Sequence, residues 1–253
     1  AVNPDDAMQG SYLGPSYKQE SIEKELSECG AIFNLATEKD MIEQTAQAIT
    51  GGKAIGWFQG RMEFGPRALG GRSILGDPRS EKMQKILNLK VKYRESFRPF
   101  APSVLREDVS DWFELDYDSP YMLLVDDVRK DKCIKMTKGE KSLFGIDRLN
   151  IKRSSIPAVT HVDYSARIQT VHKQTNPKYH ALISKFKEKT GCSVVVNTSF
   201  NVRGEPIVCT PQDAFRCFMG TELDVLVVGN CVLRKEQQDK LLTEDYKDKY
   251  ELD

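Results

Sequence analysis

The sequence contains 253 residues, of which 40% are hydrophobic and 29% charged, as expected for a globular protein with a substantial core. Its 37 lysine and arginine residues equal its 37 aspartate and glutamate residues, so net charge does not indicate a nucleic-acid partner. No apolar run is long enough to cross a membrane, and the opening AVNPDDAMQG lacks the basic and apolar parts of a signal peptide. Six cysteines without a CxxC pair favour free thiols. We therefore expect a cytoplasmic protein with no membrane partner.

Helices are predicted at several points along the chain, after a first stretch, residues 1–17, that has no periodicity and is interpreted as an incoming linker. Thr37 and Asp40 form a sequence like a capping box, which predicts a helix start there. We expect helices from Ile22 to Gly30, from Thr37 to Gly51, over 81–89 and 177–189, and from Pro211 onward.

Short apolar runs between these helices predict strands. The runs cover 31–36, 54–59, 73–76, 100–105, 121–125, 158–162, 167–171, 193–197 and 223–229. Some neighbouring runs are separated by a helix and others by a gap of hairpin length. An α/β fold with an open, twisted, mixed sheet and flanking helices is therefore expected.

Two stretches lie outside this regular pattern. Residues 130–155 are basic, polar and non-periodic, which predicts a surface excursion or mobile loop. Residues 235–253 contain four basic and seven acidic residues and are interpreted as an acidic tail. The domain itself is expected to span 18–234.

The first of two polar, glycine-containing segments runs from Phe58 to Ser80. Between Gly60 and Arg98 there are ten basic and four acidic residues, a net charge of +6. Arginine forks bind phosphate oxygens in pairs, and glycine loops expose N–H donors, so a substrate with several phosphates is indicated. The candidates are Arg61, Arg67, Arg72, Lys92 and Arg98. The alternative is a solvated charged face, which we favour for Lys82, Lys85 and Lys90.

The second segment runs from Val194 to Ala214. Strand alternation places Asn197, Ser199 and Asn201 on one side, where neutral amides and hydroxyls can orient a phosphate, a ribose or a carbamoyl group. The alternative is an Asx/Ser-rich turn whose side chains satisfy one another. Ser199 lacks the GxSxG elbow and has no recognisable triad partner.

Other phosphate and metal motifs are absent. The sequence contains neither a Walker GxxxxGK[ST] nor a GxGxxG fingerprint, which argues against P-loop and Rossmann mechanisms. Its three histidines form no metal signature. Glu63 and Glu205 are interpreted as carboxylates that orient arginines or contact magnesium, the orienting role being favoured.

Four motifs together resemble one known family, in the same order along the chain. They are EFGPRALGGRSILGDPR, KYRESFRPFAPSVL (92–105), AVTHVDYSARIQTV (158–171) and NTSFNVRGEPIV (197–208). The sequence, from about Tyr12 to Leu233, resembles the C-terminal portion of the carbamoyltransferases that O-carbamoylate nodulation factors and antibiotics. This resemblance implies a YrdC-like fold that converts carbamoyl phosphate and ATP to carbamoyl-adenylate.

The resemblance also implies roles for residues and partners. Arg67, Lys92 and Arg98 would be catalytic and, together with Arg167, would bind the phosphate groups. Ser199 and Asn201 would contact the nucleotide. The further candidate binding residues are Arg61, Arg94, Asn197 and Thr198. Mg²⁺ is expected with ATP rather than at a metal site of the protein. An N-terminal, metal-containing domain, which we expect to be missing from this chain, would bind the acceptor hydroxyl.

Two other functions remain open at this point. One is a threonylcarbamoyl-adenylate synthase that uses bicarbonate and threonine. The other is a non-catalytic module that binds nucleotide or RNA, although no basic stripe interleaved with aromatic residues supports RNA binding. A homodimer is also possible in principle.

Overall fold

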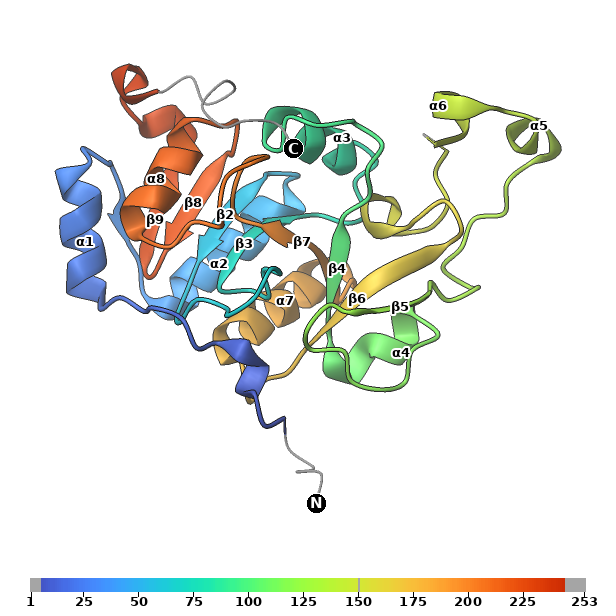
Figure 1. Ribbon diagram of the computed structural model, residues 1–253, viewed down its shortest axis with the longest axis horizontal. Helices are drawn as coiled ribbons and strands as arrows, with labels where there is room; N and C mark the ends of the chain where they lie inside the picture. The colour runs from blue at the N-terminus through green and yellow to red at the C-terminus, as the bar shows by residue number, and fades with distance from the viewer. Residues whose placement is uncertain (1–5, 150, 244–253) are drawn as a thin grey trace.

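A computed structural model describes residues 6–149 and 151–243. A nine-stranded sheet of parallel and antiparallel pairs runs through the molecule (Figure 1) in the order β1-β9-β8-β2-β3-β7-β4-β6-β5. The predicted open, mixed α/β sheet is therefore confirmed. The YrdC-like assignment is not decided by this topology and stays a prediction.

Two of the strand pairs, β2 with β8 and β4 with β6, are parallel, and the others are antiparallel. The strands are β1 (Asn34–Leu35), β2 (Ile55–Phe58), β3 (Arg72–Gly76), β4 (Ala101–Leu105), β5 (Leu124–Asp127), β6 (Ser165–Val171), β7 (Val194–Ser199), β8 (Val225–Val228) and β9 (Cys231–Arg234). Because β7 runs opposite to β3 and β4, and β6 is parallel to β4, β7 ends at the sheet edge where β3, β4 and β6 begin.

The helices that follow Thr37 and Thr210 begin at threonine caps, and the cap at Thr37 is predicted from the sequence. The Thr37 side chain accepts a hydrogen bond from the Asp40 N–H, and Thr210 and Asp213 form a capping box. The helices are α1 (Gln19–Glu28), α2 (Glu38–Thr50), α3 (Met83–Lys90), α4 (Val109–Trp112), α5 (Lys138–Lys141), α6 (Gly145–Leu149), α7 (Pro177–Thr190) and α8 (Pro211–Met219).

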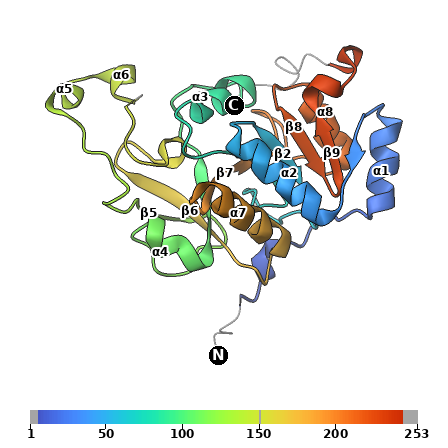
Figure 2. The same ribbon diagram turned by 180° about the vertical axis from the view of Figure 1, so that it is seen from behind.

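Helices α2 and α7 pack side by side across one face of the sheet (Figure 2). Helix α8 packs against β2 and β8, with α1 beside it. The core between these layers is apolar: Trp57, Phe186 and Phe200 are fully buried, as are the three consecutive valines of β7. Burial of both faces of a central strand explains why β7 reads as a continuous apolar run.

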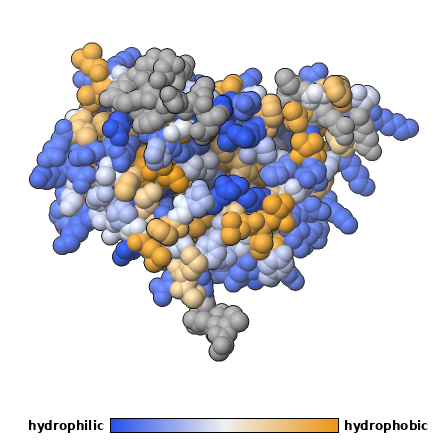
Figure 3. Space-filling view, viewed as in Figure 1, coloured by the Kyte–Doolittle hydropathy of each residue, from blue (hydrophilic) through white to orange (hydrophobic). Residues whose placement is uncertain are grey.

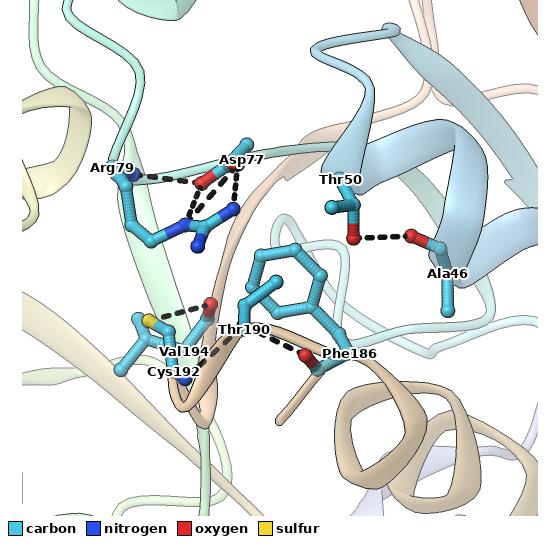
Figure 4. A network of polar contacts seen from close by, with 8 residues as sticks. All are labelled: Ala46, Thr50, Asp77, Arg79, Phe186, Thr190, Cys192 and Val194. Atoms are coloured by element: carbon cyan, nitrogen blue, oxygen red, sulfur yellow. Dashed lines mark hydrogen bonds and ion pairs between the residues drawn. The ribbon is translucent and has the colours of Figure 1, made fainter. Parts of the chain in front are cut away.

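Polar groups at the ends of these buried elements are paired (Figure 4). Arg79 makes a bidentate ion pair with Asp77, 2.6 Å at its shortest, and its guanidinium lies over the Phe186 ring. The Thr190 hydroxyl at the end of α7 donates to the Phe186 carbonyl and accepts from the Cys192 N–H. Cys192 is a buried free thiol, as predicted. This cluster stabilises the scaffold and lies outside the pocket described below.

Two predicted strands differ from the structure, and one observed strand was not predicted. Residues 158–162 were expected to be extended, but Pro157–Val159 forms a 3₁₀ turn, because proline fixes φ and removes a ladder donor. The expected strand 121–125 begins later, at Leu124, because Met122 has a left-handed φ of 55°. Strand β9 was not expected; Gly229, with φ 55°, and Asn230 turn the chain back from β8.

The segments outside the regular pattern are only partly described. Tyr12 packs inward, and its hydroxyl donates to the Leu69 carbonyl at 2.7 Å, so the stretch interpreted as a linker contacts the domain. The predicted excursion contains α5 and α6, and residue 150 lies outside the described residues, as do 1–5 and 244–253. Within 6–149 and 151–243, no helix combines the length and apolar character that membrane crossing requires.

Candidate functional site

A pocket of about 620 Å³ lies at the sheet edge where β7 ends and β4 and β6 begin. Its walls come from the loop after β2, the segment between α3 and β4, and the first half of β6. The lining residues are Pro66, Arg67, Ala68, Arg94, Arg98, Pro99, Phe100, Ala101, Met122, Val125, His161, Arg167, Asn197, Thr198 and Ser199. A concave cavity of this size suits a small molecule.

A second pocket of about 310 Å³ adjoins the first. The two share Arg94, Arg98, Thr198 and Ser199 as a common wall. Most of the predicted site residues therefore come together. Arg67, Arg94, Arg98, Arg167, Asn197, Thr198 and Ser199 line the first pocket, and Lys92 and Asn201 line the second.

Arg61 and Arg72 are not brought to either pocket. Arg61 is exposed and donates to the backbone carbonyls of Leu13 and Gly14. Arg72 is completely buried, with its guanidinium 3.5 Å from the centre of the Phe58 ring and its N–H groups on backbone carbonyls. Both arginines hold backbone in place, so the structure gives no support to the expectation that they contact phosphate.

The loop that carries Arg67 is organised by Glu63. One oxygen of its buried carboxylate accepts from the N–H groups of Leu69 and Gly71, both at 2.6 Å, and of Arg72 at 3.2 Å. Glu63 therefore binds loop backbone and does not orient an arginine side chain. Gly70 lies against Tyr179 with a φ of 103°, and a Cβ there would be 2.2 Å from the ring. The turn predicted around Arg67 thus depends on glycine for both conformation and space.

Asn197 fastens the same loop to β7. Its amide nitrogen donates to the Ala68 carbonyl at 3.0 Å and to the Gln169 side chain at 2.8 Å. Its amide oxygen is buried without a hydrogen-bond partner in the described part of the chain. Asn197 therefore fixes the residue next to Arg67 and leaves one acceptor at the pocket wall.

Lys92, just after α3, holds the second polar segment in place. Its ammonium, on a side chain that is 4% exposed, contacts the carbonyls of Ser199 (2.5 Å) and Asn201 (2.8 Å) and both of their side-chain oxygens. Asn201 in turn donates to the Glu205 carbonyl. Burial lowers the pKa of Lys92 to about 7. Lys92 is thus directed at protein oxygens, and the Ser199–Asn201 turn depends on it.

The arginines of the first pocket have no carboxylate partner among the residues that the structure describes. Across 6–149 and 151–243, no Asp or Glu forms an ion pair with Arg67, Arg94, Arg98 or Arg167. Burial and the nearby Arg98 lower the pKa of Arg94 to about 10, and burial and Arg67 lower the pKa of Arg167. Like charges held together without compensation favour binding of an anion.

Apolar groups complete the pocket. Phe100 and Met122 are buried in its wall, while Val125, on β5, is 56% exposed. The surface in Figure 3 correspondingly shows apolar groups beside strongly hydrophilic ones in the middle of the face seen in Figure 1.

His161 also lines the pocket, and burial lowers its pKa. Sequence reasoning missed this residue because 158–162 was expected to be a strand and the histidines form no metal signature. The nearby Asp163 accepts from the N–H and hydroxyl of Ser165. The only sequence signal against a strand at this position is the preceding Pro157, which favours a turn.

Metal binding has no support from clustered ligands. Among the residues that the structure describes, no three His, Cys, Asp or Glu side chains are grouped as a metal site would require. Glu205, considered as a magnesium contact, accepts from the Val202 N–H. Magnesium bound to a nucleotide stays a prediction.

Comparison with known proteins agrees with the motif pattern. The chain is 57% identical to the uncharacterized protein sll1178 of Synechocystis sp. over 100% of its own length and 42% of that protein. It is 41% identical to nodulation protein NolNO of Sinorhizobium fredii, covering 92% of the chain and 32% of the relative. It is 36% identical to the 3'-hydroxymethylcephem-O-carbamoyltransferase of Streptomyces clavuligerus, covering 75% of the chain and 32% of the relative.

The chain spans less than half the length of these relatives. The family model described as carbamoyltransferase C-terminus matches residues 46–235, which include both polar segments and every residue of the two pockets. The chain therefore belongs to the carbamoyltransferase C-terminal family.

Proposed function

We propose that this chain forms carbamoyl-adenylate from carbamoyl phosphate and ATP. The observation that carries the proposal is the group of four arginines, Arg67, Arg94, Arg98 and Arg167, around one cavity without a carboxylate partner in the described residues. Both substrates are phosphate anions, and guanidinium groups bind phosphate oxygens in pairs. The adjoining pocket offers room for a second anionic group beside the first.

The proposed reaction needs neutralisation of phosphate charge more than it needs a covalent intermediate with the protein. Water would cleave carbamoyl phosphate to carbamate and inorganic phosphate. A carbamate oxygen would then attack the α-phosphorus of ATP in line, and the bond to the β-phosphate oxygen would break to release pyrophosphate. Fixed cations around the reacting phosphates lower the barrier to such transfer, and Mg²⁺ arriving with ATP would add to them.

Enclosure supports the same proposal. Carbamate decomposes in water, so the intermediate must be held away from solvent. The buried apolar side chains of Phe100 and Met122, which lie beside Arg94 and Arg167 in the pocket wall, suit this need. Thr198 and Ser199, at the boundary between the two pockets, provide neutral groups that can orient the carbamoyl or ribose part.

The acceptor is proposed to be a hydroxyl group bound elsewhere. One relative is named for O-carbamoylation of a hydroxymethyl group, and the relatives extend well beyond the matched region. We propose that a preceding acceptor-binding domain completes the transfer. The cytoplasmic location and a homodimer stay predictions.

The test is release of pyrophosphate by the purified full-length protein given ATP, Mg²⁺ and carbamoyl phosphate. Arg98→Ala should reduce this activity about a hundredfold or more, because one well-placed cation contributes about 3 kcal/mol to the transition state. Arg129→Ala, which removes an exposed arginine paired with Asp131, should leave it unchanged.

Two results would contradict the proposal. One is unaltered turnover in the Arg98 variant. The other is pyrophosphate release that requires threonine and bicarbonate instead of carbamoyl phosphate, which would assign the chain to threonylcarbamoyl-adenylate synthesis. RNA binding without ATP binding, measured by calorimetry, would instead favour a non-catalytic module.

A further inference from the structure

Asn88, in the last turn of α3, connects this helix to the segment that carries the pocket arginines. It is completely buried. Its amide nitrogen donates to the carbonyls of Arg98 at 2.8 Å and Ser96 at 3.2 Å, and its amide oxygen accepts from Nε of Arg94 at 2.6 Å. Its backbone carbonyl also accepts from the Arg94 N–H at 3.0 Å. One residue therefore sets the backbone at Arg98 and the side chain of Arg94.

The neutral amide matters for the charge of Arg94. A carboxylate at this position would orient the guanidinium equally well, but it would also neutralise it. It would place oxygens, rather than N–H donors, against the carbonyls of Ser96 and Arg98. Asparagine satisfies both carbonyls and fixes Arg94 while leaving the positive charge for another partner.

Other contacts to Arg94 are consistent with an uncompensated charge. Its guanidinium lies 4.9 Å from the centre of the Phe100 ring, which holds its plane without removing charge. Burial and the nearby Arg98 lower the pKa of Arg94, with a smaller contribution from Arg203, and Glu95 opposes them without forming an ion pair. Arg94 and Arg98 are also shared by the two pockets.

We propose that Asn88 is a positioning residue of the anion site, which fixes Arg94 and Arg98 at the wall between the two pockets and preserves the charge of Arg94. This inference rests on the proposed function, because it assumes that the arginines bind phosphate groups. Asn88 itself lines neither pocket, so its effect on binding must pass through the arginines.

The test uses the full-length protein and calorimetric titration with inorganic pyrophosphate at several salt concentrations. Asn88→Asp should weaken pyrophosphate binding about tenfold and reduce its salt dependence, because one cation is neutralised. Gln84→Glu is the matched control: it adds the same charge one turn earlier on α3, where the side chain contacts the Phe97 carbonyl. Its effect should stay within about twofold.

A second variant addresses folding. Asn88→Ala removes the positioning contacts without adding charge, and thermal unfolding establishes which variants are folded. In a double-mutant cycle, Asn88→Ala should weaken binding much less when Arg94 is already alanine, because its effect passes largely through that side chain. A residue that only stabilises the fold would produce additive losses.

The outcomes separate the two proposals. Equal pyrophosphate affinity in the wild-type protein and in folded Asn88→Asp, or additive effects of Asn88→Ala and Arg94→Ala, would overturn the positioning role alone. Failure of the wild-type protein to bind pyrophosphate would overturn the proposed function together with this inference.

Discussion

The two polar segments that form the pocket are held by buried groups of opposite charge. In the segment after β2, the carboxylate of Glu63 gathers three backbone N–H groups. In the segment after β7, the ammonium of Lys92 gathers carbonyl and side-chain oxygens of Ser199 and Asn201. The first segment thereby presents a cation, Arg67, and the second presents neutral amides and hydroxyls.

This difference distinguishes charged residues that bond to the protein backbone from charged residues that line the pocket. Glu63, Lys92, Arg61 and Arg72 all bond to the protein's own backbone. Arg67 has no ion-pair partner in the described part of the chain, and its buried Nε has no hydrogen-bond partner there. The partners of a charged residue, more than its position in a motif, therefore indicate its role.

The largest expected effect comes from removing the buried carboxylate. Glu63→Gln should lower the free energy of unfolding by about 3 kcal/mol, because three backbone N–H groups then donate to a neutral amide oxygen in place of a charged one and the buried Arg72 loses a nearby negative charge. Urea denaturation measures this change. Glu81→Gln, at an exposed ion pair with Lys152, should change stability by less than about 0.5 kcal/mol. If both variants changed the free energy of unfolding by the same small amount, Glu63 would not be the residue that holds the loop in place.

The next effect concerns binding rather than stability. Arg67→Ala should weaken ATP binding by about 2 kcal/mol, or roughly thirtyfold, with little change in the unfolding free energy. Arg61→Ala should instead lower the unfolding free energy and leave ATP affinity nearly unchanged, because its N–H groups hold the backbone at Leu13 and Gly14. Calorimetry and thermal unfolding of both variants test the contrast. A larger loss of ATP affinity in the Arg61 variant would contradict the assignment of these two arginines.

The third effect is a pH dependence of the unfolding free energy due to Lys92. Its pKa is about 7 in the folded protein and about 10.4 in an unfolded chain, so the unfolded state binds more protons between these values. The stability of the wild-type protein relative to Lys92→Met should therefore rise from pH 7 to pH 9, by at most about 1.4 kcal/mol per pH unit. Urea denaturation at three pH values measures it. A constant difference would mean that Lys92 stays charged throughout.

The sheet could be anticipated where local patterns were strong. The apolar run of β7 and the capping sequence at Thr37 predicted their elements, because burial and capping act within a few residues. The turn at Pro157 and the late start of β5 were missed. At both places a single backbone restriction outweighed the apolar pattern.

The sequence predicted which residue types form the pocket, but not which residues line it and which hold the backbone. Arg61, Arg67 and Arg72 lie in one motif, yet only Arg67 lines the cavity. Asn88 gave no signal, because an asparagine in an amphipathic helix resembles any polar surface position. Its role follows from contacts with carbonyls eight and ten residues away in a folded loop.

By itself, the sequence determined the order of most helices and strands, the family and the two segments rich in arginine, glycine and asparagine, because these depend on residue type and short-range spacing. Only the tertiary structure decided which cations remain without a carboxylate and which are used to hold backbone. That distinction depends on long-range contacts such as Lys92 with Asn201, 109 residues apart. Such contacts form only when the strands that carry both segments meet at one edge of the sheet.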